Sequence, residues 1–167
     1  MRKAAFAAVV NAATQVLVLG SLPGEASLAA AQYYAHPQNQ FWRLMGAVIG
    51  MDLDAAPYRE RLAMVLAAGV GLWDVIESAE RMGSLDGAIR NHTPAPLDAL
   101  VASLPCLTVI AFNGAKASQI GRKQLGVSSC PALITLPSSS PAHTLPLASK
   151  QTEWMKLRPF LVHQTRA

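Results

Sequence analysis

Two short stretches of this chain combine ligand-binding residue types with a rigid backbone. Residues 20–24 read Gly-Ser-Leu-Pro-Gly and follow the apolar run 16–19, and residues 136–143 read Leu-Pro-Ser-Ser-Ser-Pro-Ala-His and follow the run 132–135. Each apolar run is typical of a buried strand that ends where the polar stretch begins. Because α/β proteins bind ligands in the loops that leave the carboxyl ends of parallel strands, both stretches are candidate binding loops.

A third segment, residues 33–42, brings together aromatic rings, an imidazole and an amide in the order Tyr-Tyr-Ala-His-Pro-Gln-Asn-Gln-Phe-Trp. The Asn39 amide in this segment donates and accepts hydrogen bonds but has no useful pKa. It is therefore able to position a water molecule but not to act as its general base. The alternative is that Asn39 caps the helix that follows, which is a common use of asparagine.

Apolar patterns predict the elements that position these segments. Strand patterns cover residues 16–19, 72–73 with their flanks, 108–111 and 132–136. Helical patterns cover residues 39–49, 58–68, 97–103 and 114–125. Strands that alternate with helices predict a parallel sheet covered on both faces. We therefore expect a three-layer α/β/α fold with a central, mainly parallel sheet of about four strands.

The composition predicts a single folded domain over residues 1–167. Hydrophobic residues make up 51% of the chain and charged residues only 14%, which excludes a disordered polypeptide. The formal net charge of +4 fits a nucleic-acid partner without requiring one. Because the basic side chains are dispersed along the chain, folding has to assemble any DNA-binding surface.

Cysteine usage and the N-terminus bear on cofactors and location. Cys106 and Cys130 are expected to be free, buried thiols in a reducing cytosol. No Cys or His spacing fits zinc or an iron–sulfur cluster, so the sequence predicts neither metal nor cofactor. Residues 1–10 form a short, Ala-rich stretch that we interpret as a docked segment, not a signal peptide. These features together favour a cytoplasmic protein.

The three segments, in this order and spacing, resemble the uracil-DNA glycosylase superfamily. The chain is similar to its hypoxanthine (deoxyinosine) DNA glycosylase branch and, more distantly, to mismatch-specific uracil glycosylases. The resemblance covers residues 16–160. It implies an enzyme that swings a damaged base out of DNA, stabilises the departing base and brings water to C1′ of the sugar.

The resemblance assigns the attacking water to Asn39. Other branches carry an acidic residue or an asparagine in the first motif, but the matching position here is Leu22, which cannot bind water. Glu25, one residue past the motif, is the only nearby carboxylate. With Asn39 only positioning the water, most of the acceleration is expected from stabilising the leaving group and from the DNA phosphates near the cationic sugar.

Base recognition is expected from Asn113 and Tyr34. Deaminated bases share an O=C–N–H edge, which the amide of Asn113 matches with its neighbouring donor and acceptor. The alternative for Asn113 is a cap or turn residue before Gly114. Tyr34 aligns with the aromatic residue on which related enzymes stack the flipped base, and its alternative is an ordinary core aromatic.

The two glycine- and serine-rich loops are expected to hold the base and the DNA. The backbone around Ser21, Leu22 and Gly24 is expected to donate N–H groups to the base or a phosphate, with a simple tight turn as the alternative. The second loop resembles the motif that enters the minor groove, and solvated turns are its alternative. Its predicted DNA-binding residues are Ser138, Ser139, Ser140, Pro141 and His143.

Three further positions complete the sequence-based assignment. Leu136 stands where other branches have a histidine that polarises the base carbonyl, and leucine cannot do so. Asp74 follows a predicted strand, where it fits a site residue and a helix cap equally well, and we leave it outside the catalytic set. Arg122 and Lys123 are expected on the DNA-binding surface. No lysine lies in the loops near the first motif, which argues against a Schiff-base lyase.

The sequence therefore predicts a monofunctional, cofactor-free and monomeric DNA glycosylase that removes a deaminated base, with hypoxanthine favoured. Within the class, the alternative is a uracil-DNA glycosylase directed at mismatches or single strands. Outside it, the alternative is a catalytically inert nucleic-acid-binding module, against which the joint presence of Asn39, Tyr34 and Asn113 argues. A nucleoside hydrolase would instead act on free deoxyinosine.

Overall fold

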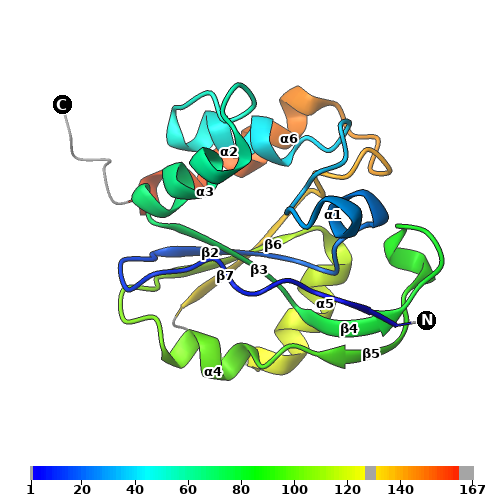
Figure 1. The fold of residues 1–167 in the computed structure, drawn as a ribbon. Coiled ribbons are helices and arrows are strands. Elements are labelled where there is room, and N and C mark those ends of the chain that lie inside the picture. The colour runs from blue at the N-terminus through cyan, green and yellow to red at the C-terminus, as the bar shows by residue number, and fades with distance from the viewer. Residues whose placement is uncertain (1, 127–130, 162–167) are drawn as a thin grey trace.

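A four-stranded parallel sheet forms the centre of the molecule (Figure 1). The computed structural model describes residues 2–126 and 131–161. Along the sheet the strands are ordered β3 (Val70–Asp74), β2 (Val16–Gly20), β6 (Val109–Asn113) and β7 (Ala132–Leu136), and each neighbouring pair is parallel. The predicted parallel sheet of about four strands is therefore confirmed.

Burial of both faces explains why the central strands are continuous apolar runs. All residues of β2 and β6 are buried. Val16 and Val18 of β2 join one hydrophobic cluster, while Leu17 and Leu19 join another. Side chains that alternate along a strand point to opposite faces of a sheet, so each cluster is the core of one layer interface. The three-layer prediction is confirmed.

Helices cover the two faces of the sheet unequally. One side carries α2 (Phe41–Ile49), α3 (Tyr58–Ala67) and α6 (Leu147–Trp154), and the other carries α4 (Leu97–Ala102) and α5 (Ala115–Leu125) (Figure 1). The short helices are α1 (Glu25–Ala30) and the 3₁₀ turns η1 (Asp86–Ala88) and η2 (Met155–Phe160). None of the helices in the described ranges is long and apolar enough to cross a membrane.

The structure also contains a second sheet, antiparallel, which the sequence did not predict. It contains β1 (Arg2–Ala4), β4 (Ile76–Glu80) and β5 (Arg90–Pro94), in the order β1-β4-β5. The predicted docking of the N-terminal segment is confirmed by β1, which pairs with β4. Every residue of β5 is exposed, so no apolar pattern marked it as a strand. The link from β4 to β5 carries η1 to the candidate site.

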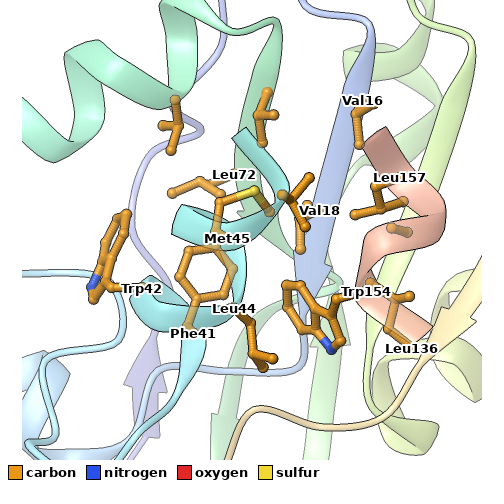
Figure 2. Close-up of a cluster of buried hydrophobic side chains, with 14 of the residues drawn as sticks. Val16, Val18, Phe41, Trp42, Leu44, Met45, Leu72, Leu136, Trp154 and Leu157 are labelled. Atoms are coloured by element: carbon orange, nitrogen blue, oxygen red, sulfur yellow. The ribbon is translucent and has the colours of Figure 1, made fainter. Parts of the chain in front are cut away.

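The larger core cluster fixes the segment that precedes α2. Phe41 and Met45 of α2 are fully buried and lie with Trp154 and Leu157 in one cluster (Figure 2). The Phe41 and Trp154 rings meet edge to face, with centroids 5.6 Å apart. Such packing leaves the first turn of α2 little freedom, so the loop before it is held rigidly.

One sequence-based expectation about the cysteines is wrong. Cys106 is a free thiol, but it is exposed, because it lies in the short connection between α4 and β6 and not in either core cluster. Cys130 lies outside the described residues.

Candidate active site

A cavity of about 860 Å³ opens at the carboxyl ends of the four parallel strands. It brings together all three segments singled out in the sequence, as expected for an α/β fold. The predicted site residues that line it are Ser21, Leu22, Gly24, Tyr34, Asn39, Asn113, Ser138, Ser139, Ser140, Pro141 and His143. Among the lining residues that the sequence left outside the site are Asp74, Ser84, Asp86 and Arg90.

Gly20, at the end of β2, lies in a crowded part of the site. A Cβ atom on Gly20 would lie 2.7 Å from Oδ1 of Asp74 and 3.0 Å from the hydroxyl oxygen of Tyr34. Real Cβ atoms do not approach a carboxylate oxygen so closely, so a side chain here would force the two polar groups apart. Gly20 thus lets Asp74 and Tyr34 meet beside the strand end.

Ser139 ties three parts of the site together. Its backbone N–H donates to Oδ1 of Asn113 at 2.8 Å, and Nδ2 of Asn113 donates to its hydroxyl oxygen at 2.9 Å. Its carbonyl oxygen accepts a hydrogen bond of 3.0 Å from the Gln40 backbone N–H. Both buried side chains are thereby satisfied, and the loops after β6 and β7 are fixed to the segment before α2.

The same bonds bear on the predicted role of Asn113. Both ends of its amide face Ser139, so the amide has to leave or share these partners before it can read a base. Base reading by Asn113 stays a prediction, and the anchoring of the Ser139 loop is the role that its contacts display.

Asn39 combines the two roles weighed from the sequence. Its Oδ1 accepts a hydrogen bond of 2.9 Å from the Phe41 backbone N–H, which tethers the start of α2. The side chain is partly exposed and lines the cavity, and Nδ2 has no protein partner among the described residues. Oδ1 keeps a second lone pair, so the amide is still able to donate to and accept from a water molecule.

Tyr34 is held in an uncommon conformation. Its φ is 54°, in the left-handed region that a tyrosine rarely adopts, and its ring stacks on Phe41 with centroids 3.9 Å apart and planes 11° apart. Its hydroxyl is buried and has no hydrogen bond of good geometry, although the Asn113 side chain interacts with it. Burial and then the nearby Asp74 raise the pKa of the Tyr34 hydroxyl, against the opposing effect of Asn113, so it remains a proton donor.

Asp74 is the feature that sequence reasoning undervalued. Its side chain is only 3% exposed, its Oδ2 has no hydrogen-bond partner, and it lines the cavity. It caps no helix, because the chain passes from β3 directly into β4. Burial, and then repulsion from Asp86, raise the pKa of Asp74 from 3.8 to about 7, against the opposing effect of Arg81.

The neighbours of Asp74 hold the first glycine-rich loop. The Ser21 hydroxyl donates to Oδ1 of Asp86 at 2.6 Å, and Arg81 donates to the carbonyl oxygen of Pro23. Glu25 forms an ion pair of 3.3 Å with Lys3 and is not among the residues that line the cavity. Its contacts therefore give no support to Glu25 as the residue that handles water.

Two side chains of α6 donate hydrogen bonds to the serine-rich loop, residues 137–143. Nζ of Lys150, which is almost fully buried, donates to the carbonyl oxygen of Ser140 at 3.2 Å, and Nε1 of Trp154 donates to that of Pro137 at 2.9 Å. Desolvation lowers the pKa of Lys150. Leu136 is buried, and its side chain has no polar group that could contact the base.

The two DNA contacts predicted on α5 lie away from the cavity. Arg122 and Lys123 occupy the last turn of α5, at the end of the helix away from the cavity, and neither is among the lining residues. Arg122 instead donates hydrogen bonds to Ser118 and Thr135.

Comparison with known proteins bears out the resemblance. The family model described as the uracil DNA glycosylase superfamily matches residues 7–161. A curated protein from Methanosarcina barkeri (strain Fusaro / DSM 804), named hypoxanthine DNA glycosylase, is 37% identical over 92% of this chain and 96% of its own. A protein of the same name from Methanosarcina acetivorans is 36% identical over the same shares.

A solved structure agrees with these matches. The solution NMR structure of a candidate uracil DNA glycosylase from Methanosarcina acetivorans superposes with a TM-score of 0.83 at 35% identity, covering 96% of this chain and 99% of that one. The family match spans the cavity and every element around it. The chain belongs to the uracil-DNA glycosylase superfamily.

Proposed function

We propose that this chain is a monofunctional DNA glycosylase that hydrolyses the N-glycosidic bond of hypoxanthine in DNA. Membership of the superfamily makes it a hydrolase of N-glycosyl bonds with DNA as substrate. The names of both curated relatives support hypoxanthine as the base. The observation that carries the proposal is the single cavity lined jointly by Asn39, Tyr34 and Asn113.

The cavity supplies what hydrolysis of a flipped nucleotide needs. A water held by the Asn39 amide attacks C1′ as the bond to the base breaks, which gives an abasic site and the free base. Tyr34 and the backbone of residues 20–24 enclose the base. Residues 138–143 and Arg90 line the mouth of the cavity, where the Arg90 guanidinium and the His143 imidazole are able to contact DNA phosphates.

Water is the favoured nucleophile. No lysine is among the residues that line the cavity, and the nearby Lys150 is directed to the Ser140 carbonyl. Without an amine at the site, a Schiff base with the abasic sugar has no source. The described residues also contain no cluster of His, Cys, Asp and Glu side chains suited to a metal ion.

The test uses labelled duplexes that contain inosine, uracil or xanthine, treated with enzyme excess and then with alkali. We expect strand cleavage at inosine only after alkali, with no effect of EDTA. Asn39→Ala is the inactive comparison, and Gln38→Ala, an exposed neighbour in the same loop, is the matched control that keeps activity. Absence of cleavage on all three substrates would refute the proposal.

Other outcomes identify the alternatives. Cleavage of uracil but not inosine would make the chain a uracil-DNA glycosylase, and release of hypoxanthine from free deoxyinosine would make it a nucleoside hydrolase. A monomeric, cytoplasmic enzyme is part of the proposal. Size-exclusion chromatography with light scattering and fractionation of the source cells test these two points.

A further inference from the structure

Building on the proposed function, we infer that Asp74 and the Tyr34 hydroxyl form the proton-donating wall of the cavity, and that Asp74 protonates the base as it departs. Five buried side-chain polar atoms in the described residues have no hydrogen-bond partner. Only two of them belong to residues that line the cavity, Oδ2 of Asp74 and the hydroxyl oxygen of Tyr34. Buried polar atoms without partners are rare, and a ligand in the cavity would satisfy both.

The two side chains lie on the same side of the cavity. The Cβ position on Gly20 is 2.7 Å from Oδ1 of Asp74 and 3.0 Å from the Tyr34 oxygen, so both side chains converge beside the end of β2. The sheet fixes Asp74, whose backbone pairs with that of Gly20, and stacking on Phe41 fixes the Tyr34 ring. The groups are therefore pre-arranged, as electrostatic stabilisation of a transition state requires.

Two amides that line the cavity already use hydrogen-bonding atoms within the protein. Asn113 has both ends of its amide bonded to Ser139, and Oδ1 of Asn39 holds the Phe41 N–H. Leu136 has no polar group. A purine that leaves with the electron pair of its glycosidic bond needs a proton donor, and the buried Asp74 carboxyl beside the Tyr34 hydroxyl is placed to provide one.

The surroundings of Asp74 keep its carboxyl protonated near neutral pH. Desolvation and the negative charge of Asp86 on η1 favour the neutral form, while Arg81 after β4 opposes them. Tyr33 and Tyr34, which approach from the loop after α1, have hydroxyl pKa values raised by burial and add no charge. The pKa of Asp74 is about 7, so at lower pH its carboxyl carries the proton that the reaction uses.

The atoms and electrons of the step balance. The C1′–N bond breaks and its electron pair stays with the base, which takes the proton of the Asp74 carboxyl onto one of its ring nitrogens. The oxygen of water bonds to C1′ and releases one proton to solvent. Asp74 regains a proton from solvent before the next turnover, so no co-reactant is needed.

The pH dependence of single-turnover excision tests this inference. On an inosine duplex, the wild-type rate should be level below about pH 7 and fall about tenfold per pH unit above it, because only the neutral carboxyl donates. Asp74→Asn should be at least about a hundredfold slower at pH 6 and should lose this fall. A wild-type rate in Asp74→Asn, or a fall that persists unchanged in it, would overturn the inference.

Two neighbours sharpen the test. Asp86→Asn removes a negative charge beside Asp74, so the fall in rate should begin at a lower pH than in wild type; an unmoved fall would assign the titration to another group. Tyr34→Phe keeps the ring on Phe41 and should slow excision while keeping the fall. An unchanged rate in that variant would remove Tyr34 from the proton-donating wall.

Controls separate this inference from folding defects and from the proposed function. Asp98→Asn changes an exposed aspartate on α4 in the same way and should match wild type in rate and pH dependence. A cooperative thermal unfolding transition at pH 6, no lower in temperature than that of wild type, excludes misfolding of the variants. Wild type that is inactive on inosine at every pH would refute the proposed function, whereas an active wild type with a level profile to pH 9 would refute only the role of Asp74.

Discussion

Replacing Asp74 by Asn should stabilise the protein at alkaline pH while it slows excision. The folded state raises the pKa of Asp74 from 3.8 to about 7, so between these values the folded chain holds a proton that the unfolded chain has released. Folding stability from this group is therefore complete below about pH 4, declines as pH rises toward 7 and stays low above it. An amide of the same shape cannot ionise and escapes this decline.

The size of the effect follows from the shift. A change of about 3 pKa units at about 1.4 kcal/mol per unit gives at most about 4 kcal/mol between pH 4 and pH 8. We expect at least half of it, about 2 kcal/mol, because buried carboxyls relax and admit water on ionisation. Since a small domain has only about 5–15 kcal/mol of total stability, such a change is easily measured.

The assay is urea unfolding of wild type and Asp74→Asn at several pH values from 4 to 8. The difference in unfolding free energy between the two proteins should grow in favour of the variant as pH rises and level off above about pH 7. Using the difference cancels the titration of groups that both proteins share. A difference that stays constant with pH would show that the pKa of Asp74 is not raised in the folded state and would refute the reasoning.

Three further variants probe other parts of the site. Asn39→Ala should lose most excision activity, while DNA binding measured by fluorescence anisotropy stays nearly unchanged. It should also lose about 1 kcal/mol of stability, because the hydrogen bond to the start of α2 is removed. Near-normal excision would mean that Asn39 only caps the helix. Gly20→Ala should cost about 1–3 kcal/mol in urea unfolding and most activity, because the new methyl displaces Asp74; a fully active variant would contradict that crowding. Lys150→Met should weaken DNA binding measurably, because the Ser140 carbonyl oxygen loses its hydrogen bond from Lys150, but it should leave the melting temperature unchanged. Unchanged DNA affinity would show that this hydrogen bond does not contribute to DNA binding.

The central sheet could be predicted because its local signals agree with its environment. The strand residues 16–19 and 109–111 are apolar runs, and burial on both faces of a parallel sheet selects such runs. The strand β5 could not be found, because exposed Arg90–Pro94 pairs with β4 through its backbone and has no pattern of its own. The helix α6 was missed as well, since only Lys150 and Trp154 in it are buried.

The site could be predicted as a set of segments but not as a set of contacts. Asn39 and Tyr34 were predicted from the resemblance, and Asn113 also from its place at a strand end; all three line the cavity, and their roles stay predictions. The pairing of Asn113 with Ser139 had no local signal, since the two residues lie 26 positions apart and only the folded sheet brings them together. In the sequence, Asp74 fitted a site residue and a helix cap equally well. Only the tertiary structure reveals its burial and its missing partner.

The three bonds at Ser139 also have a consequence for how the chain acquires its activity. They join β6, β7 and the segment before α2, and the bond to Gln40 spans more than half of the chain. Contacts between residues so distant in sequence require large loops to close and tend to form late in folding. A collapsed intermediate that has formed only part of the sheet therefore has no assembled cavity. Activity recovered after dilution from denaturant should count native molecules alone, even while secondary structure has already returned.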